Sequence, residues 1–474
     1  MAAYASACGQ DQCDRPVFGY IVFCQAMFSL EPSRLSMQLT HAVHELAHVL
    51  GFSSMLFRYF RDPQGSPLVP RDPNNTRLFE EEVPYECDAS TNEVSQWGSG
   101  KELTHVDLAP RVADHFDERG FSQCGCPIGT SAFDANACLV RPGPFKRPHC
   151  VVKIGLPTVV EKVREHFGCP ELNGAELENQ DTSTCQVFGS HWEGRLFAGE
   201  LMSAVSESDG AIFVSNVTLA LLQDSGWYKV DWAMADELVP GVHWGVRQGC
   251  DFATKRCVEA GETAHPRHFC TRHGENACSL ERRRVRQCSV ATAAPGSLPA
   301  VFDYFGGSGQ HGPEFRLDYC PAYTLTVSGR ACGDAASVRQ AMRLELLGEG
   351  SRCLTSTLRN GSAAGAPAPG CYRAECAAHA ASYTVWAEGM GGVVSLGSCT
   401  AAGARLAAPG LAGYVECAAP AELCGVRPSR HQQIAGLDPL NPPPPSASAC
   451  AGRLRSIAAL VFAVALLRVA PRPW

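Results

Sequence analysis

Cysteine constrains how this chain folds more than any other residue type. The 474 residues include 24 cysteines, spread from Cys8 to Cys450. This density, sustained over hundreds of residues, is typical of proteins made in an oxidising compartment, where thiols pair as disulfides. We therefore expect an extracellular or cell-surface protein whose fold is held by up to about twelve bridges.

The composition narrows the class of protein further. Hydrophobic residues make up 45% of the chain and charged residues 19%, which is enough apolar material for a large core. Lysine and arginine number 40 against 48 aspartates and glutamates, a formal net charge of −8. Nucleic-acid binding is therefore not expected, because it needs a basic surplus.

The two ends of the chain bear on export. Residues 1–8 contain no basic stretch followed by an apolar one, so no signal peptide is visible and we expect an incomplete N-terminus. Near the other end, the Pro-rich spacer Asn441–Ala449 precedes an apolar run, Ile457–Leu467. As a helix that run would be about 16 Å long, too short to span about 30 Å of hydrocarbon. Small residues at 446–448 before such a tail favour a GPI-attachment signal, and a membrane-embedded tail or an incidental apolar end are the alternatives.

The cysteine count depends on this tail. Cleavage near Ser446 would remove Cys450 and leave 24 − 1 = 23 cysteines, an odd number. We therefore expect the disulfide set to be incomplete, with Cys8, Cys13 or Cys24 lacking its partner.

One segment, Met37–Gly51, carries most of the chemistry. It is rich in Leu, Ala and Met with no internal Gly or Pro, which predicts a helix, and Gly51 stands where a glycine commonly ends one. His44 and His48 are four residues apart, so both imidazoles project from one helix face and can share a zinc ion. Glu45 can reach a metal-activated water without binding the metal, which is the general-base role in the His-Glu-x-x-His pattern. His41 lies on nearly the same face, but Ala42 follows it and offers no base.

A zinc site needs a third protein ligand, and the residues alone leave it open. The metzincin position for that ligand is Ser54 here, and the sequence Phe52–Phe60 indicates that the helix continues, so we expect the ligand further along. His166 is predicted on the polar side of an amphipathic helix that ends at Gly168. The candidates are His105, His115, His149, His166 and His191.

The motifs resemble those of leishmanolysin-type metallopeptidases, and most of all the invadolysin branch. The likeness covers the chain to about Cys424. It implies that His191 is the third zinc ligand, that Met202 is the Met-turn residue, that one zinc ion is bound and that proteins or peptides are the substrates. The matching segments are His44–Phe52, Phe167–Pro170, Gly174–Gln180, Gly189–Glu193, Glu200–Met202, Leu219–Tyr228 and Gly249–Phe252.

We accordingly predict an α+β fold, with a zincin-like catalytic domain followed by a disulfide-rich, mostly β C-terminal domain. Substrate is expected to pair with an edge strand at Gly19–Phe23, which alternates in the β manner. The predicted parts are 1–60, a partial N-terminal subdomain with the active-site helix; 61–155, a Cys-containing insertion; 156–260, a central subdomain with the third ligand and the Met-turn; 261–427, the Cys-rich domain; and 428–474, a linker and tail.

Weaker signals remain. Sequons at Asn74, Asn216 and Asn360 predict a glycoprotein, although Ser215 reads as a helix N-cap beside Asn216. Cys124 and Cys126 are expected in disulfides rather than at a second metal, and the basic run 282–286 is expected on a solvated face rather than at a polyanion site. The alternative function is a cell-surface adhesion or interaction protein with an inactive metallopeptidase site.

Overall fold

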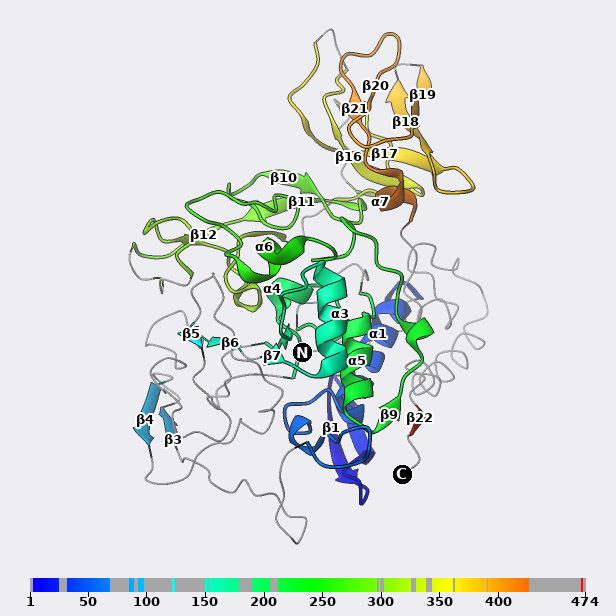
Figure 1. Cartoon of the computed structure of the whole chain (residues 1–474). Helices are drawn as coiled ribbons and strands as arrows, with labels where there is room; N and C mark the ends of the chain where they lie inside the picture. The colour runs from blue at the N-terminus through cyan, green and yellow to red at the C-terminus, as the bar shows by residue number, and fades with distance from the viewer. Residues whose placement is uncertain are drawn as a thin grey trace.

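The computed structural model describes most of the chain outside the predicted insertion and tail. The described residues are 3–24, 32–68, 153–178, 190–204, 212–295, 298, 302–324, 330–337, 343–360, 363–389 and 391–425, with short strands at 85–88, 93–97, 122–123, 150–151 and 470–471. Figure 1 shows a hairpin and helices at one end of the molecule and a β-sheet lobe at the other.

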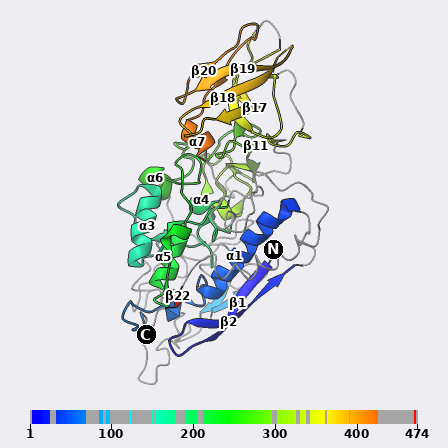
Figure 2. The same cartoon turned by 90° about the vertical axis from the view of Figure 1, so that its right-hand side faces the viewer.

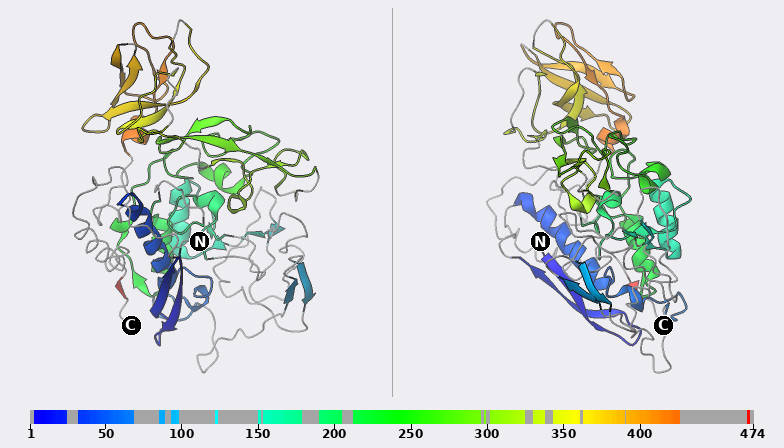
Figure 3. Two further views of the ribbon diagram at one scale, coloured as in Figure 1. Left: turned by 180° about the vertical axis from the view of Figure 1, so that it is seen from behind. Right: turned by 90° about the vertical axis from the view of Figure 1, so that its left-hand side faces the viewer.

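The N-terminal part is a hairpin packed on one long helix. Strands β1 (Ala3–Gln10) and β2 (Pro16–Phe23) pair antiparallel, and α1 (Pro32–Leu50) lies along them (Figures 2 and 3). The approach is close because Gly19 has no side chain: a Cβ there would lie 2.5 Å from Cγ1 of Val49. On its other side α1 buries an apolar stripe at helical spacing, formed by Leu39, Val43 and Ala47.

The segment after α1 differs from the prediction. The helix ends at Leu50, and Phe52–Phe60 forms turns and a single 3₁₀ turn, Phe57–Tyr59, instead of a helical continuation. Its rings are nonetheless buried, and Phe60 meets Trp227 edge to face at 5.1 Å between ring centroids. The apolar character of the segment therefore reflects core packing and not helical periodicity.

The central part is mainly helical. Strands β7 (Lys153–Ile154) and β8 (Ala175–Glu176) pair beside α3 (Pro157–Phe167). The carboxylate of Asp224 accepts hydrogen bonds from the backbone N–H groups of Thr158 and Val159 at 2.7 and 3.1 Å and so ties the start of α3 to the end of α5. The remaining elements here are α4 (Gly194–Phe197), α5 (Asn216–Asp224), β9 (Tyr228–Lys229), the 3₁₀ turn Trp232–Met234 and α6 (Gly249–Thr254).

The prediction for His166 was wrong. Its side chain is buried, not on a polar surface, and its ring lies 5.5 Å from that of Phe197. The last turn of α3 is covered by a neighbouring segment, since the Arg247 N–H donates to the His166 carbonyl at 2.7 Å and a disulfide joins Cys169 to Cys250.

The C-terminal half confirms the expected disulfide-rich, mostly β part. Strand β11 pairs antiparallel with β10, β14 and β15, and a six-stranded antiparallel sheet has the order β19-β18-β17-β16-β21-β20, ending near the short helix α7 (Figure 1). The strands are β10 (Asn276–Cys278), β11 (Arg284–Ser289), β12 (Ala291–Thr292), β13 (Gln310–His311), β14 (Ala322–Thr324), β15 (Arg330–Ala331), β16 (Ser351–Ser356), β17 (Ala368–Cys376), β18 (Tyr383–Gly389), β19 (Gly392–Cys399), β20 (Arg405–Leu406) and β21 (Val415–Glu416), with a 3₁₀ turn at Phe315–Leu317 and α7 at Pro420–Cys424.

Most of the disulfides lie in this half, and one joins two segments of the central part. The pairs among the described residues are Cys169–Cys250, Cys257–Cys320, Cys270–Cys288, Cys278–Cys353, Cys332–Cys371, Cys376–Cys424 and Cys399–Cys417. Cys8, Cys13 and Cys24 have no sulfur partner within the described part of the chain. Cys124, Cys126 and Cys450 lie outside it.

The basic run at 282–286 is not a solvated face. Arg282 bonds to the Glu422 carboxylate at 3.2 Å, and Arg286, 6% exposed, lies 3.4 Å from the Glu281 carboxylate. The Arg282–Glu422 pair connects α7 to the β10–β11 region, and the Arg286–Glu281 pair lies within that region. These arginines therefore pack against other parts of the fold.

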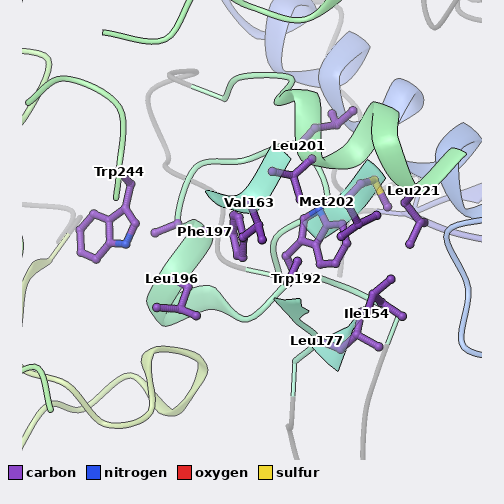
Figure 4. Close-up of a cluster of buried hydrophobic side chains, with 14 of the residues drawn as sticks. Ile154, Val163, Leu177, Trp192, Leu196, Phe197, Leu201, Met202, Leu221 and Trp244 are labelled. Carbon is purple, nitrogen blue, oxygen red and sulfur yellow. The ribbon is translucent and has the colours of Figure 1, made fainter. Parts of the chain in front are cut away.

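The largest core lies between α1, α3 and α5 and includes the fully buried Trp192 and Met202 (Figure 4).

In the described ranges no helix has the length and apolarity needed to cross a bilayer. The apolar run Ile457–Leu467 and Asn74 fall outside those ranges. The short strands are β3 (Tyr85–Asp88), β4 (Glu93–Trp97), β5 (Ser122–Gln123), β6 (Cys150–Val151) and β22 (Ala470–Pro471).

Candidate metal centre

Three histidines from two distant parts of the chain meet at one point. His44 and His48 lie one turn apart on α1, and His191 comes from the turn that precedes α4. The Nε2 atom of His44 lies 3.0 Å from that of His48 and 3.2 Å from that of His191. Among the described residues, these three form the group of side chains able to hold a metal ion.

The opposite nitrogen of each ring bonds to an acceptor that cannot donate. Nδ1 of His44 donates to the Leu201 carbonyl at 2.6 Å, Nδ1 of His48 to the Phe52 carbonyl at 2.7 Å, and Nδ1 of His191 to Oε1 of Glu178 at 2.6 Å. Each neutral ring therefore carries its proton on Nδ1 and presents a lone pair at Nε2.

Burial keeps the rings of His44 and His48 neutral. Burial lowers the pKa of His48 to about 4, and it lowers the pKa of His44 well below the usual value, with the neighbouring His48 and His191 acting in the same direction. Converging lone pairs about 3 Å apart repel one another unless a cation lies between them. Ligand atoms on a tetrahedral zinc, at about 2.0–2.1 Å each, are separated by about 3.3–3.4 Å. The donor set and its spacing thus fit a zinc ion.

Glu45 lies beside this centre without joining it. Its side chain is 6% exposed, and Oε2 is buried with no hydrogen-bond partner among the described residues. Burial raises the pKa of Glu45 to about 7, partly offset by His191. A nearby cation would favour the ionised form. The arrangement leaves one carboxylate oxygen free to exchange a proton.

His191 is held by a short ladder between two segments. The Glu178 N–H donates to the His191 carbonyl at 2.8 Å, and the Glu193 N–H donates to the Glu176 carbonyl at 3.0 Å. The Ser54 N–H donates to Oγ of Ser190 at 3.0 Å. Ser54, which stands at the metzincin ligand position, therefore contacts the residue next to His191.

The turn that contains Met202 is held by hydrogen bonds to neighbouring segments. Met202 is fully buried beside Trp192 (Figure 4). Its backbone carbonyl accepts a hydrogen bond from the Trp192 N–H at 2.8 Å. Glu200 accepts hydrogen bonds from the Met202 N–H at 2.5 Å and from Oγ of Ser215 at 2.7 Å. Leu201, which stands between Glu200 and Met202 in the sequence, supplies the backbone carbonyl that orients the His44 ring. The turn therefore connects the His191 segment, α1 and the start of α5.

Sequence reasoning placed some of these residues and missed others. Ser215 is the N-cap of α5, as expected, with Oγ accepting from the Thr218 N–H at 3.2 Å. His41 is half-buried and stays outside the histidine group. The acceptors Glu178 and Glu200 were missed; only the proximity of Glu200 to Met202 offered a signal, since nothing in the spacing ties Glu178 to His191. His105, His115 and His149 fall outside the described residues.

The expected substrate strand lies within β2, which pairs with β1 along one edge. No other strand pairs with β2 in the described part of the chain. Val17, Phe18 and Tyr20 on it are exposed.

Comparison with known proteins finds relatives over most of this chain. The family model for leishmanolysin matches residues 1–64 and 139–429, and residues 65–138 between them are unmatched. A leishmanolysin-like peptidase of Drosophila pseudoobscura pseudoobscura is 28% identical over 383 residues, 74% of this chain and 49% of the relative. The leishmanolysin-like peptidase of Caenorhabditis elegans is 28% identical over 348 residues, 67% of this chain and 44% of the relative.

Leishmanolysin of Leishmania major is 31% identical over 256 residues, 53% of this chain and 40% of the relative. The animal relatives thus align over more of this chain than the Leishmania protein does, as a resemblance to the invadolysin branch predicts. The chain spans about half the length of the animal relatives that it matches. Because the family model covers well over half of the sequence, the chain belongs to the leishmanolysin family of metallopeptidases.

Proposed function

We propose that this protein is a zinc-dependent endopeptidase in which His44, His48 and His191 bind one zinc ion and Glu45 is the general base. The observation that carries the proposal is the set of three rings whose Nδ1 protons are engaged and whose Nε2 lone pairs converge. Met202 is proposed as the Met-turn residue beneath the ligands.

A zinc ion bound there would polarise the scissile carbonyl and make a water molecule easier to deprotonate. Glu45 would accept the proton from that water at its free Oε2 and deliver it to the nitrogen of the leaving amine. The buried setting of Glu45 suits this exchange, since a carboxylate whose pKa is raised toward neutrality accepts a proton from water more readily than an ordinary carboxylate does and can still give it up near pH 7. No covalent intermediate with the enzyme is needed.

Replacement of the base tests the mechanism directly. Glu45→Gln keeps the size of the side chain and removes the base, so the hydrolysis rate of a quenched fluorescent peptide should fall by about 10²–10⁴. Bound zinc, measured by atomic absorption, should be unchanged because Glu45 is not a ligand. The control is Glu165→Gln, a change on the exposed face of α3. Hydrolysis at the wild-type rate by the Glu45 variant would rule out the mechanism.

Loss of a ligand tests the metal site. His191→Ala should remove most of the bound zinc, and a strong chelator should abolish the activity of the wild-type chain. Wild-type zinc content in that variant would point to a different third ligand.

We propose that the substrates are proteins or peptides that pair with the open edge of β2. The disulfides support a site of action outside the cell, either secreted or at the membrane surface through the C-terminal tail. We propose in addition that the chain divides into the five parts predicted above, with boundaries at residues 60, 155, 260 and 427. We also propose that the protein is glycosylated and carries a GPI anchor. The alternative, an adhesion protein with an inactive site, predicts a folded chain that binds no zinc.

A further inference from the structure

Of the three candidate ligands, His191 depends on its surroundings in a different way from the others. His44 and His48 are fixed by the backbone of α1 and donate to backbone carbonyls. His191 lies outside any helix or strand, and its Nδ1 donates to a side chain, Oε1 of Glu178, at 2.6 Å. The position of this ring therefore depends on a group that can be changed without altering the backbone.

Glu178 is well placed to accept the hydrogen bond from Nδ1 of His191. It is 7% exposed, and the same oxygen that accepts from His191 also accepts from the Ser190 N–H at 3.1 Å. One carboxylate oxygen thus fixes both the ring and the backbone directly before it. A carboxylate can only accept here, so it also selects the tautomer with a free lone pair at Nε2.

Neighbouring carboxylates have other partners. Glu176, two residues earlier, lies 3.6 Å from Nζ of Lys153. Glu193, two residues after His191, accepts from the Arg195 N–H at 3.0 Å. Among the described hydrogen bonds, Glu178 is thus the glutamate on this ladder that contacts a histidine of the metal centre.

We propose that Glu178 is a positioning residue that acts through His191, holding its ring in the orientation and tautomer that complete the zinc site. The proposal rests on the proposed function, and it extends that function to a residue that does not touch the metal. Carboxylate partners of metal-bound histidines typically contribute 10–100-fold to metal affinity.

The test is a double-mutant cycle on zinc affinity in the full chain. Dissociation constants are measured by competition with a chromophoric chelator for the wild type, Glu178→Gln, His191→Ala and the double variant. We expect Glu178→Gln to weaken zinc binding by about 10–100-fold in the wild-type background. In the His191→Ala background the same substitution should cause little further loss of zinc affinity. The matched control Glu165→Gln should bind zinc like the wild type, since that side chain is exposed on α3.

A second measurement reports the coordination geometry of the bound metal instead of its affinity. The visible absorption of bound Co²⁺ should lose the intensity of tetrahedral coordination in Glu178→Gln and regain part of it in Glu178→Asp, which restores an anionic acceptor. If Glu178→Gln does not fold, the same cycle is run with Glu178→Ala, which also removes the anionic acceptor.

The outcomes separate the two proposals. Wild-type zinc affinity in the variant that lacks the carboxylate, or an equal loss in the His191→Ala background, would overturn the positioning role and leave the zinc peptidase intact. A wild-type chain that binds no zinc would overturn both.

Discussion

Acid should destabilise this fold through a histidine that is not part of the metal centre. His166 is buried, its Nε2 atom has no hydrogen-bond partner among the described residues, and its ring packs against Phe167 and Phe197. Burial lowers the pKa of His166 to about 4, partly opposed by a hydrogen bond to the backbone of Trp244 and slightly reinforced by His243. Protonation would place a positive charge among aromatic rings, so the folded state resists it.

The magnitude follows from the difference between the folded and unfolded states. The unfolded chain binds a proton at this ring near pH 6.5 and the folded chain only near 4, so stability rises with pH across that window and is lost as the pH falls through it. With those two values the loss between pH 7 and pH 5 is about 2 kcal/mol, and it reaches about 3 kcal/mol by pH 4.

The assay compares the wild type with His166→Phe, which keeps a ring of similar size and cannot titrate. Denaturant unfolding of the metal-free, disulfide-intact proteins gives the free energy of unfolding at pH 7 and at pH 5. The change between the two pH values is then compared for wild type and variant, so that the contributions of the other histidines cancel. The variant should lose about 2 kcal/mol less than the wild type over this interval. Equal losses in the two proteins would refute the reasoning, because His166 would then titrate normally in the folded state.

Three further outcomes are expected. Gly19→Val should weaken the packing of β2 on α1 by about 1–3 kcal/mol, because a Cβ at Gly19 would lie 2.5 Å from Cγ1 of Val49; thermal unfolding measures the loss, and an unchanged midpoint would contradict the packing. Ser215→Ala should cost about 1–2 kcal/mol, since it removes both the α5 N-cap and a donor to the buried Glu200; wild-type stability in urea would show that the bond is dispensable. Zinc added at 100 times its dissociation constant should stabilise the metal-free protein by about 2.7 kcal/mol, and a midpoint independent of zinc would argue against a site present only in the folded state.

Local rules worked where a single element decides the outcome. The spacing of His44 and His48 needs only the helical repeat to bring both rings to one face, and α1 provides that repeat. Ser215 likewise caps α5 through a bond to a residue three positions ahead. The mostly β, disulfide-linked C-terminal half also follows from composition, because its cysteines and short strands leave few alternatives.

The same rules failed where a distant segment covers an element. Periodicity predicts an exposed His166, but the chain around Arg247 closes over that turn of α3. The arginines near 282 look solvated until α7 supplies Glu422. In both cases the burial of a polar face depends on a partner far along the chain, which no local pattern encodes.

The helix that carries His44, Glu45 and His48 follows from the local sequence, and the resemblance to the family pointed to His191 and Met202. How His191 reaches that helix, and which groups hold each ring, depends on the way distant segments pack. Ser54 meets Ser190, Leu201 bonds to His44, and Glu178 bonds to His191. The physical reason is that a helix forms from bonds between residues four apart, whereas a metal centre closes through contacts between segments more than a hundred residues apart.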